Sequence, residues 1–396
     1  MATIAENLVA LQEAKSNIKS AIESKGQDLT DVPFTQYADK INAISVGGGD
    51  GDDTLKGLID GTLTDLVIPE GTTKIRAYAF YNYLSLRKIE IPDTVTDFGQ
   101  RCCEGCVSLT SFKINANSKA SGLATMAFSN CRSLVEVYDL RENTLTGAAA
   151  GLPSDVRILK AGEPSVIYGD EQGTQYFEYE DGKYKVLSYY GEDEQLIIPQ
   201  TINNKPITGV RQYGFYNAKL KNITLPDGLT TIESRAFYYS KLLENVNIPN
   251  TVTTIGQYAF NYCEKLQNIS IPEGISTIEQ YTFSYCSALK NIVIPDSVTS
   301  IGNYAFQNCI GLTSVTIGSN LSSIGSNGFY WCPNILTYDF TKCTQIPTLG
   351  NANVFTSINS KCKIYVPDAL YDEWKVATNW TSVASKIYKL SEMPAE

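Results

Sequence analysis

The feature that most constrains this chain is a repeat of 23 residues. A Val/Ile-x-Ile-Pro tetrad places its second isoleucine at Ile248, Ile271 and Ile294, and a variant without proline follows at Ile317. A small residue followed by phenylalanine recurs as well, and it ends at Phe80, Phe128, Phe215, Phe237, Phe260, Phe283, Phe306 and Phe329. One unit has only about six apolar positions, so it cannot bury them without neighbours above and below. The period therefore predicts a β-rich solenoid.

The residues within one unit predict its local structure. Ile292 and Ile294 alternate with polar residues, which indicates a short strand, and Pro295 ends its ladder pairing. Ile301 marks a second short extended piece, and Phe306 returns to the core across a turn. Strands from successive units should be parallel and stack about 4.8 Å apart.

These markers resemble the BspA-like, treponemal-type leucine-rich repeat family. The resemblance covers roughly residues 55–140 and 185–340. It implies a leucine-rich repeat solenoid that displays a surface, and members of the family are often cell-surface proteins that bind host or bacterial partners.

The cysteines follow the same period. Cys131, Cys263, Cys286, Cys309 and Cys332 each lie three residues after the marker phenylalanine, and Cys106 takes the equivalent place in its unit. We interpret these six of the ten cysteines as small buried packing residues. The Cys103-Glu-Gly-Cys106 pair has no second half, so no metal site is expected.

Composition excludes several functions. The chain has no histidine, which removes histidine-dependent catalysis and metal sites. Its net charge of −10 makes nucleic acid an unfavourable partner. No apolar run approaches the roughly 20 residues of a membrane span, so no membrane insertion is expected. Glu233 and Glu279 share one repeat position, but Gly256 and Gly302 occupy it in other units. We therefore predict no catalytic residues, no cofactor and no enzymatic activity.

The N-terminal residues break the period. An apolar stripe with helical spacing predicts an amphipathic helix, and a shorter helix follows Pro33; the stripe comprises Ile4, Leu8, Leu11, Ile18 and Ile22. Two short helices form little core of their own, so residues 1–46 should attach to another chain or oligomerise. A helical hairpin folded onto its own solenoid is the alternative. Residues 11–26 and 32–42 are similar to N-terminal segments of structural proteins from gut bacteriophages.

The domain plan follows from these breaks. Residues 47–54 form a Gly/Asp linker, residues 55–140 the first repeat block, and residues 141–195 an irregular connector with a hairpin cap around Asp181-Gly182. The second block spans residues 196–340. Residues 341–396 form a C-terminal strand-helix cap, whose helical run carries Leu370, Trp374, Trp380, Val383 and Ile387.

Two columns of side chains are the candidate ligand-binding residues, because solenoids bind through positions repeated on successive turns. The first column precedes the central strand residue and comprises Asn222, Asn245, Asn268 and Asn291. The second precedes the Ala/Thr-Phe pair and comprises Tyr258, Tyr281 and Tyr304. Both columns have a structural interpretation, as ladders along the stack. They also have a functional one, as an uncharged surface that binds a glycan or protein through ring stacking and amide hydrogen bonds.

The sequence favours a bacteriophage virion protein of the tail, baseplate or head. Its N-terminal helices would bind other virion proteins, and its repeats would bind a host surface protein or glycan. The start of the chain lacks the basic region and apolar stretch of an export signal, which agrees with assembly in the host cytoplasm. The alternative is a bacterial cell-surface adhesin.

Overall fold

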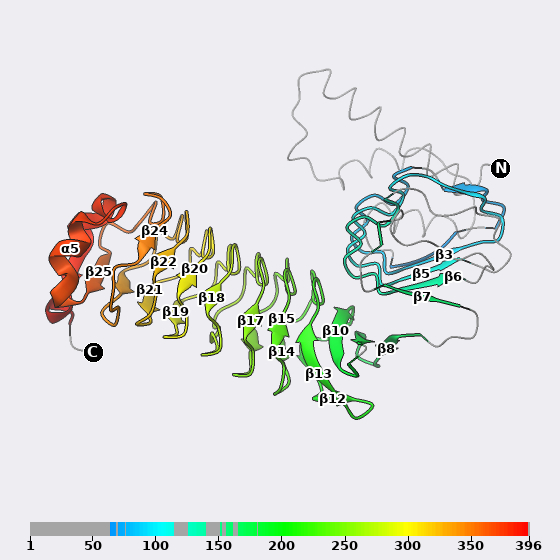
Figure 1. Ribbon diagram of the computed structural model, residues 1–396, viewed down its shortest axis with the longest axis horizontal. Helices are drawn as coiled ribbons and strands as arrows, with labels where there is room; N and C mark the ends of the chain where they lie inside the picture. Colours follow the sequence, from blue (N-terminus) through cyan, green and yellow to red (C-terminus); the bar gives the residue numbers. More distant parts are fainter. Residues whose placement is uncertain are drawn as a thin grey trace, which may run out of the picture. The chain divides into compact units, whose positions relative to one another are not determined.

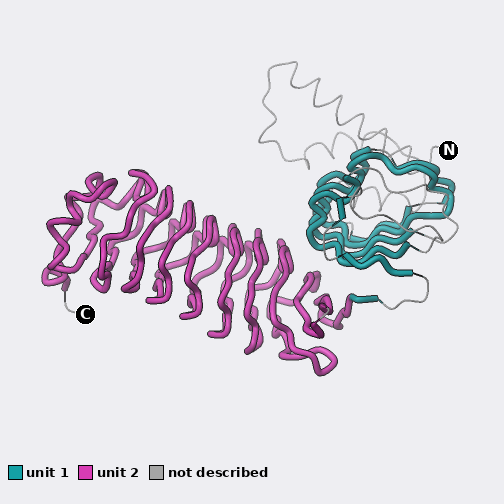
Figure 2. Tube along the Cα trace, in the orientation of Figure 1, with its two compact units in different colours: residues 1–166 teal, residues 167–396 magenta. Residues whose placement is uncertain are grey.

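The computed structural model describes residues 64–394 except 69, 76, 115–125, 140–150, 153–155, 161–164 and 180. The chain divides into two compact units, one ending at Val166 and one beginning at Ile167 (Figure 2). The predicted helical segment 1–46 and the linker 47–54 lie outside the described residues, and so do the docking candidates Ile4, Leu8, Leu11, Ile18 and Ile22.

The first unit is built from parallel strands that pair in chain order. One sheet joins β1 (Asp65–Val67), β3 (Lys88–Ile91), β5 (Ser111–Ile114), β6 (Glu136–Asp139) and β7 (Arg157–Leu159). A second sheet joins β2 (Lys74–Ile75) and β4 (Asp97–Phe98). Pairing in chain order means that each turn of the chain stacks on the turn before it. β7 continues the first sheet beyond residue 140, where the sequence predicts an irregular connector.

The second unit begins with antiparallel strands. β8 (Ile167–Gly169), β9 (Thr174–Glu178) and β10 (Tyr184–Tyr189) pair in that order, which confirms the predicted hairpin around Asp181-Gly182. β10 then pairs in parallel with the first strand of the repeat array, β13 (Lys205–Val210). The same sheet continues to β15 (Thr231–Ile232) and β17 (Thr254–Ile255), and β12 (Thr201–Ile202) pairs with β13.

The other strands of the second unit are all parallel and form three sheets (Figure 1). The first contains β11 (Gln195–Ile197), β14 (Asn222–Thr224) and β16 (Asn245–Asn247). The second contains β18 (Thr277–Ile278), β20 (Ser300–Ile301), β22 (Ser323–Ile324) and β24 (Thr348–Leu349). The third contains β19 (Asn291–Ile294), β21 (Ser314–Ile317), β23 (Thr337–Asp339), β25 (Lys363–Val366) and β26 (Ile387–Lys389). The predicted parallel stacking and second short strand of each unit are confirmed.

The C-terminal residues pack two tryptophans against the last repeats. Helix α5 (Tyr371–Val376) is flanked by 3-10 turns η1 (Asp368–Leu370), η2 (Trp380–Lys386) and η3 (Leu390–Glu392). Trp374 and Trp380 are fully buried, with ring centroids 5.6 and 5.4 Å from that of Phe340. The predicted helical run is divided into short helical pieces that contain Leu370, Trp374, Trp380 and Val383, and it is wrong at Ile387, which lies in β26 and pairs with Ile364.

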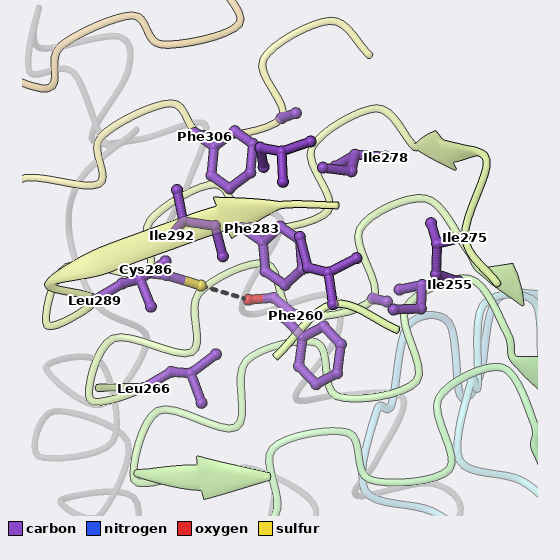
Figure 3. Packing of buried hydrophobic residues seen from close by; sticks show 14 of the residues in the cluster. Ile255, Phe260, Leu266, Ile275, Ile278, Phe283, Cys286, Leu289, Ile292 and Phe306 are labelled. Atoms are coloured by element: carbon purple, nitrogen blue, oxygen red, sulfur yellow. Dashed lines mark hydrogen bonds between the residues drawn. The ribbon is translucent and has the colours of Figure 1, made fainter. Parts of the chain in front are cut away.

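The marker phenylalanines form a buried column through the core of the second unit, as predicted. Neighbouring rings are nearly parallel; for example, the Phe237 and Phe260 centroids are 4.9 Å apart. Figure 3 shows this column beside the buried strand residues. In the first unit, Cys103 replaces a marker phenylalanine. There the strand residue Phe112 stands in register with Ile89 and Val137, and its ring lies 4.6 Å from that of Phe128. A larger strand residue thus offsets the smaller turn residue, as close packing requires.

The cysteines are buried and reduced, as the sequence predicts for six of them. Each repeat cysteine also donates its thiol hydrogen to a carbonyl of the preceding turn. Cys286 Sγ lies 3.3 Å from the Phe260 carbonyl oxygen (Figure 3), and Cys309 Sγ lies 3.0 Å from that of Phe283. Ser240 donates its hydroxyl to Phe215 in the same way where a turn lacks cysteine. The column is therefore a series of hydrogen bonds between turns as well as a packing element.

Candidate functional site

The asparagine column lies on the outer face of the first strand of each repeat. Asn245, Asn268 and Asn291 are exposed, and Asn222 is partly exposed. Asn222 and Asn245 are opposite each other in adjacent strands, and the Asn245 Nδ2 donates to Asn222 Oδ1 at 2.8 Å. At the other end, Thr313 and Ser314 donate their hydroxyls to Asn291 Oδ1 at 3.0 and 2.7 Å. The column is therefore a hydrogen-bonded ladder at both ends.

Asn268 interrupts this ladder. Within residues 181–394, all of which the structure describes, its side-chain amide makes no hydrogen bond, and its main chain meets the neighbouring strand only through an isolated bridge to Asn245. A shallow depression lies at this point of the strand face, lined by Asn245, Val246, Asn247, Asn268, Ile269, Ser270 and Asn291. The structure thus brings three of the four candidate asparagines to one depression.

The candidate tyrosines stack on one another. The ring centroids of Tyr258 and Tyr281 are 4.8 Å apart, as are those of Tyr281 and Tyr304, with interplanar angles of 12° and 0°. The guanidinium of Arg235 covers Tyr258, 4.4 Å from the ring centroid. Both faces of Tyr281 are occupied, so a ligand meets ring edges and hydroxyl groups. Recognition by stacking on the ring faces, which the sequence analysis expects, does not fit this geometry.

A second tyrosine column runs beside the marker phenylalanines. Tyr262 stacks on Tyr239 at 4.5 Å and on Tyr285 at 4.3 Å, and the Nζ of Lys241 lies 5.4 Å from the Tyr239 centroid. These three tyrosines each stand two residues after a marker phenylalanine, where the sequence shows a cluster of aromatics, but they are not among the candidate ligand-binding residues above. We call the two columns together the tyrosine ledge, which comprises Tyr239, Tyr258, Tyr262, Tyr281, Tyr285 and Tyr304.

Every residue of the tyrosine ledge has a left-handed backbone, with φ between 56° and 63°. Asparagine and glycine adopt this conformation readily, whereas for a bulky side chain it costs about 1–2 kcal/mol. The equivalent positions on neighbouring turns carry Asn217, Asn308 and Asn327, which share the conformation. Each ring stack returns about 0.5–1.5 kcal/mol. Stacking thus offsets the backbone cost.

The ledge is uncharged at neutral pH. Burial, followed by the neighbouring phenols Tyr285 and Tyr239, raises the pKa of Tyr262 to about 12. Burial also raises the pKa of Tyr281. The phenols of Tyr262 and Tyr281 therefore remain neutral hydrogen-bonding groups and are poor nucleophiles.

The described residues offer no group of three or more cysteine or acidic side chains placed to hold a metal ion. Glu233, which shares its repeat position with Glu279, accepts hydrogen bonds from Lys185 Nζ at 2.7 Å and from the Gln212 N–H at 3.0 Å. The second contact joins neighbouring turns, and the first reaches across β13 to β10. Across the part of the chain that the structure describes, no helix combines the length and the apolar character needed to cross a bilayer.

A family model described as the BspA type leucine rich repeat region matches residues 59–147 and 208–336, more than half of the chain. The chain belongs to this family. The phage-like N-terminal resemblance receives no support from the comparisons. No curated protein matches the chain.

The chain is also similar to solved structures. A leucine-rich repeat protein from Eubacterium ventriosum is 20% identical, with a TM-score of 0.50, and the match covers 75% of this chain and 83% of that one. A leucine rich repeat protein from T. pallidum is 26% identical, with a TM-score of 0.46, over 52% of this chain and 92% of that one. A leucine rich cell surface protein from Faecalibacterium prausnitzii is 21% identical, with a TM-score of 0.40, over 70% and 79%.

Proposed function

We propose that this protein is a non-enzymatic recognition protein of the bacterial cell-surface adhesin class, which docks a protein partner through the tyrosine ledge. Family membership supports a binding role for the repeat array. The virion role that the sequence analysis favours has no support in the comparisons, and its N-terminal docking residues lie outside the described part of the chain.

The observation that carries the proposal is the ledge itself. Tyrosine is enriched at protein-recognition surfaces, because it adds contact area and a hydroxyl at low entropic cost. Six partly exposed tyrosines lie in two columns here, on backbone positions where asparagine carries no conformational cost. Because stacking fixes the rings before binding, little side-chain entropy remains to be lost on docking.

The test is cell binding by the full chain. Fluorescently labelled protein is incubated with mammalian epithelial cells and, separately, with bacterial cells, and bound protein is measured by flow cytometry. We expect saturable binding to epithelial cells. A Tyr239→Asn/Tyr262→Asn/Tyr285→Asn variant keeps a residue suited to the left-handed backbone and should bind at least about tenfold more weakly.

Tyr78→Asn is the matched control. Tyr78 has the same left-handed conformation in the first unit, outside the ledge, so this variant should bind like the native protein. Equal binding by the ledge variant would refute docking through the ledge. Absence of saturable binding to either cell type would refute the adhesin role.

A further inference from the structure

Strand pairing in the second unit is interrupted between two successive turns, which meet on the strand face only through the isolated Asn245–Asn268 bridge. One turn contains β16, β17 and Phe260, and the next contains residues 268–270, β18 and Phe283. β16 and β17 each end a sheet, and β18 begins a new one. Within residues 181–394, all of them described, no other pair of successive repeat turns lacks strand pairing on both sheets. We call this interruption the seam.

The turns remain joined on the side of the tyrosine ledge. Across the seam, the N–H groups of Tyr258, Phe260 and Tyr262 donate to carbonyls of the next turn at 2.9–3.1 Å. The Phe260 and Phe283 centroids are 5.6 Å apart, the widest step between Phe215 and Phe329. The Tyr262–Tyr285 distance is only 4.3 Å. The two turns therefore diverge at β17 and β18, whereas beside the strand face the Gln267 N–H still donates to the Glu244 carbonyl at 3.0 Å.

One cause of the divergence lies just after the second strand. Gly256 and Gly302 approach the preceding turn so closely that a Cβ would lie 2.4 and 2.6 Å from its main-chain nitrogens. Glu279 occupies the equivalent place at the seam and carries a Cβ, so its turn cannot approach as closely. Glu233 also breaks the glycine pattern, but its carboxylate accepts the Gln212 N–H and so bonds to the turn before it. Glu279 has no such contact among the described residues.

The seam leaves amide groups without partners on the strand face. In a regular ladder, Asn268 would link Asn245 to Asn291. Instead Asn245 Oδ1 remains an unused acceptor, Asn291 Nδ2 an unused donor, and the whole Asn268 amide is unpaired within the described residues. These groups surround the depression described above, with the half-buried Ile269 among its lining residues.

The depression is uncharged. None of its lining residues ionises. The equivalent face of the first unit is charged, with Lys88 Nζ 2.6 Å from Glu90 Oε1 and Lys113 Nζ 3.8 Å from Glu90 Oε2. A charged ligand would find no counter-ion at the seam, which favours a ligand that is neutral and carries both hydrogen-bond donors and acceptors.

We propose that the seam binds one pyranose ring of a neutral glycan. The C–H face of the sugar packs against Ile269, and its hydroxyls donate to Asn245 Oδ1 and accept from Asn291 Nδ2. The Asn268 amide bonds a third hydroxyl as donor or acceptor. This site lies on the strand face and does not depend on the tyrosine ledge.

A glycan array tests the proposal. The full chain is applied to immobilised neutral oligosaccharides that end in glucose, galactose, mannose or N-acetylglucosamine, together with sialylated and sulfated glycans. We expect binding to a subset of the neutral glycans. An Asn268→Ala/Asn291→Ala variant should bind that subset at least about tenfold more weakly, which corresponds to about 1.4 kcal/mol.

Two controls make the outcome specific. Thr316→Ala changes a hydroxyl on the same face, outside the depression and without a hydrogen bond to any lining residue, and should leave glycan binding unchanged, as should the ledge variant Tyr239→Asn/Tyr262→Asn/Tyr285→Asn. Absence of binding to any neutral glycan, or binding that Asn268→Ala/Asn291→Ala does not weaken, would overturn the proposal. Loss of glycan binding in the ledge variant would also contradict it. Failure of the ledge to bind cells would leave the seam proposal intact.

Discussion

Replacement of Phe283 by alanine tests the core of the repeat array. The Phe283 ring is 1% exposed and stacks between Phe260 at 5.6 Å and Phe306 at 5.4 Å. Truncation of a buried phenylalanine costs about 3–5 kcal/mol. The two ring pairs account for about 1–3 kcal/mol of this loss, at about 0.5–1.5 kcal/mol each. The remainder comes from lost apolar burial and from the cavity.

Urea unfolding followed by circular dichroism measures this loss. Because turns contact only their neighbours, removal of a central ring should also weaken the coupling between the turns on either side. We therefore expect a lower midpoint and a broader or two-step transition. Phe283→Leu retains much of the apolar volume and should lose less. A loss below about 1 kcal/mol for Phe283→Ala would show that the phenylalanine column does not hold the turns together, and our packing argument would fail.

Three further predictions concern the columns beside the phenylalanines. Cys286→Ser should lower the free energy of unfolding in urea by less than Cys286→Ala does, because a serine hydroxyl can donate to the Phe260 carbonyl as Ser240 does to that of Phe215. The two variants should differ by about 0.5–1.5 kcal/mol. Equal losses would exclude the hydrogen bond. Tyr262→Asn should change the unfolding free energy by less than about 1 kcal/mol, because relief of the left-handed backbone offsets two lost ring stacks; a loss above about 3 kcal/mol would contradict this balance. Burial raises the pKa of Cys332 to about 12, whereas the thiol of an unfolded chain has a pKa of about 8.5. The contribution of this buried neutral thiol to the free energy of unfolding is therefore fully present below about pH 8.5. It is lost as the pH rises toward 12, at up to about 1.4 kcal/mol per pH unit. Urea unfolding at pH 7.5, 9 and 10 should show the decline, with a smaller slope in Cys332→Ser; a stability independent of pH over this range would contradict it.

The sequence predicts the repeat and its core well, because periodicity and burial are directly coupled. A residue that recurs every 23 positions occupies the same place on each turn, so Phe260 and Phe283 had to share one environment, as did Cys263 and Cys286. The sequence does not predict that the large side chain of Phe112 offsets the small one of Cys103 in the first unit. That prediction requires knowing that a strand residue and a turn residue fill the same space.

The tyrosine conformation could not be predicted from residue type. Tyr262 and Tyr285 adopt a left-handed backbone that tyrosine ordinarily avoids. The available signal was substitution within the column, since Asn308 replaces tyrosine on the next turn, and asparagine favours that conformation. The C-terminal helix was overestimated for a related reason. Apolar spacing indicated a helix there, but pairing with β25 draws Ile387 into a strand.

At the seam, the repeat pattern predicts strand pairing that the structure does not have. Residues 268–272, Asn-Ile-Ser-Ile-Pro, match the strand sequence of their neighbours closely, so the pattern predicts an unbroken ladder. One cause of the break is Glu279, several residues away, where neighbouring turns have glycine. Its Cβ limits how closely the turn of β18 approaches the turn of β17, and across this step the Asn268 amide makes no hydrogen bond to Asn245. In a stacked array, therefore, a candidate binding residue is better recognised by an irregularity in the packing of its turn than by its membership of a regular column.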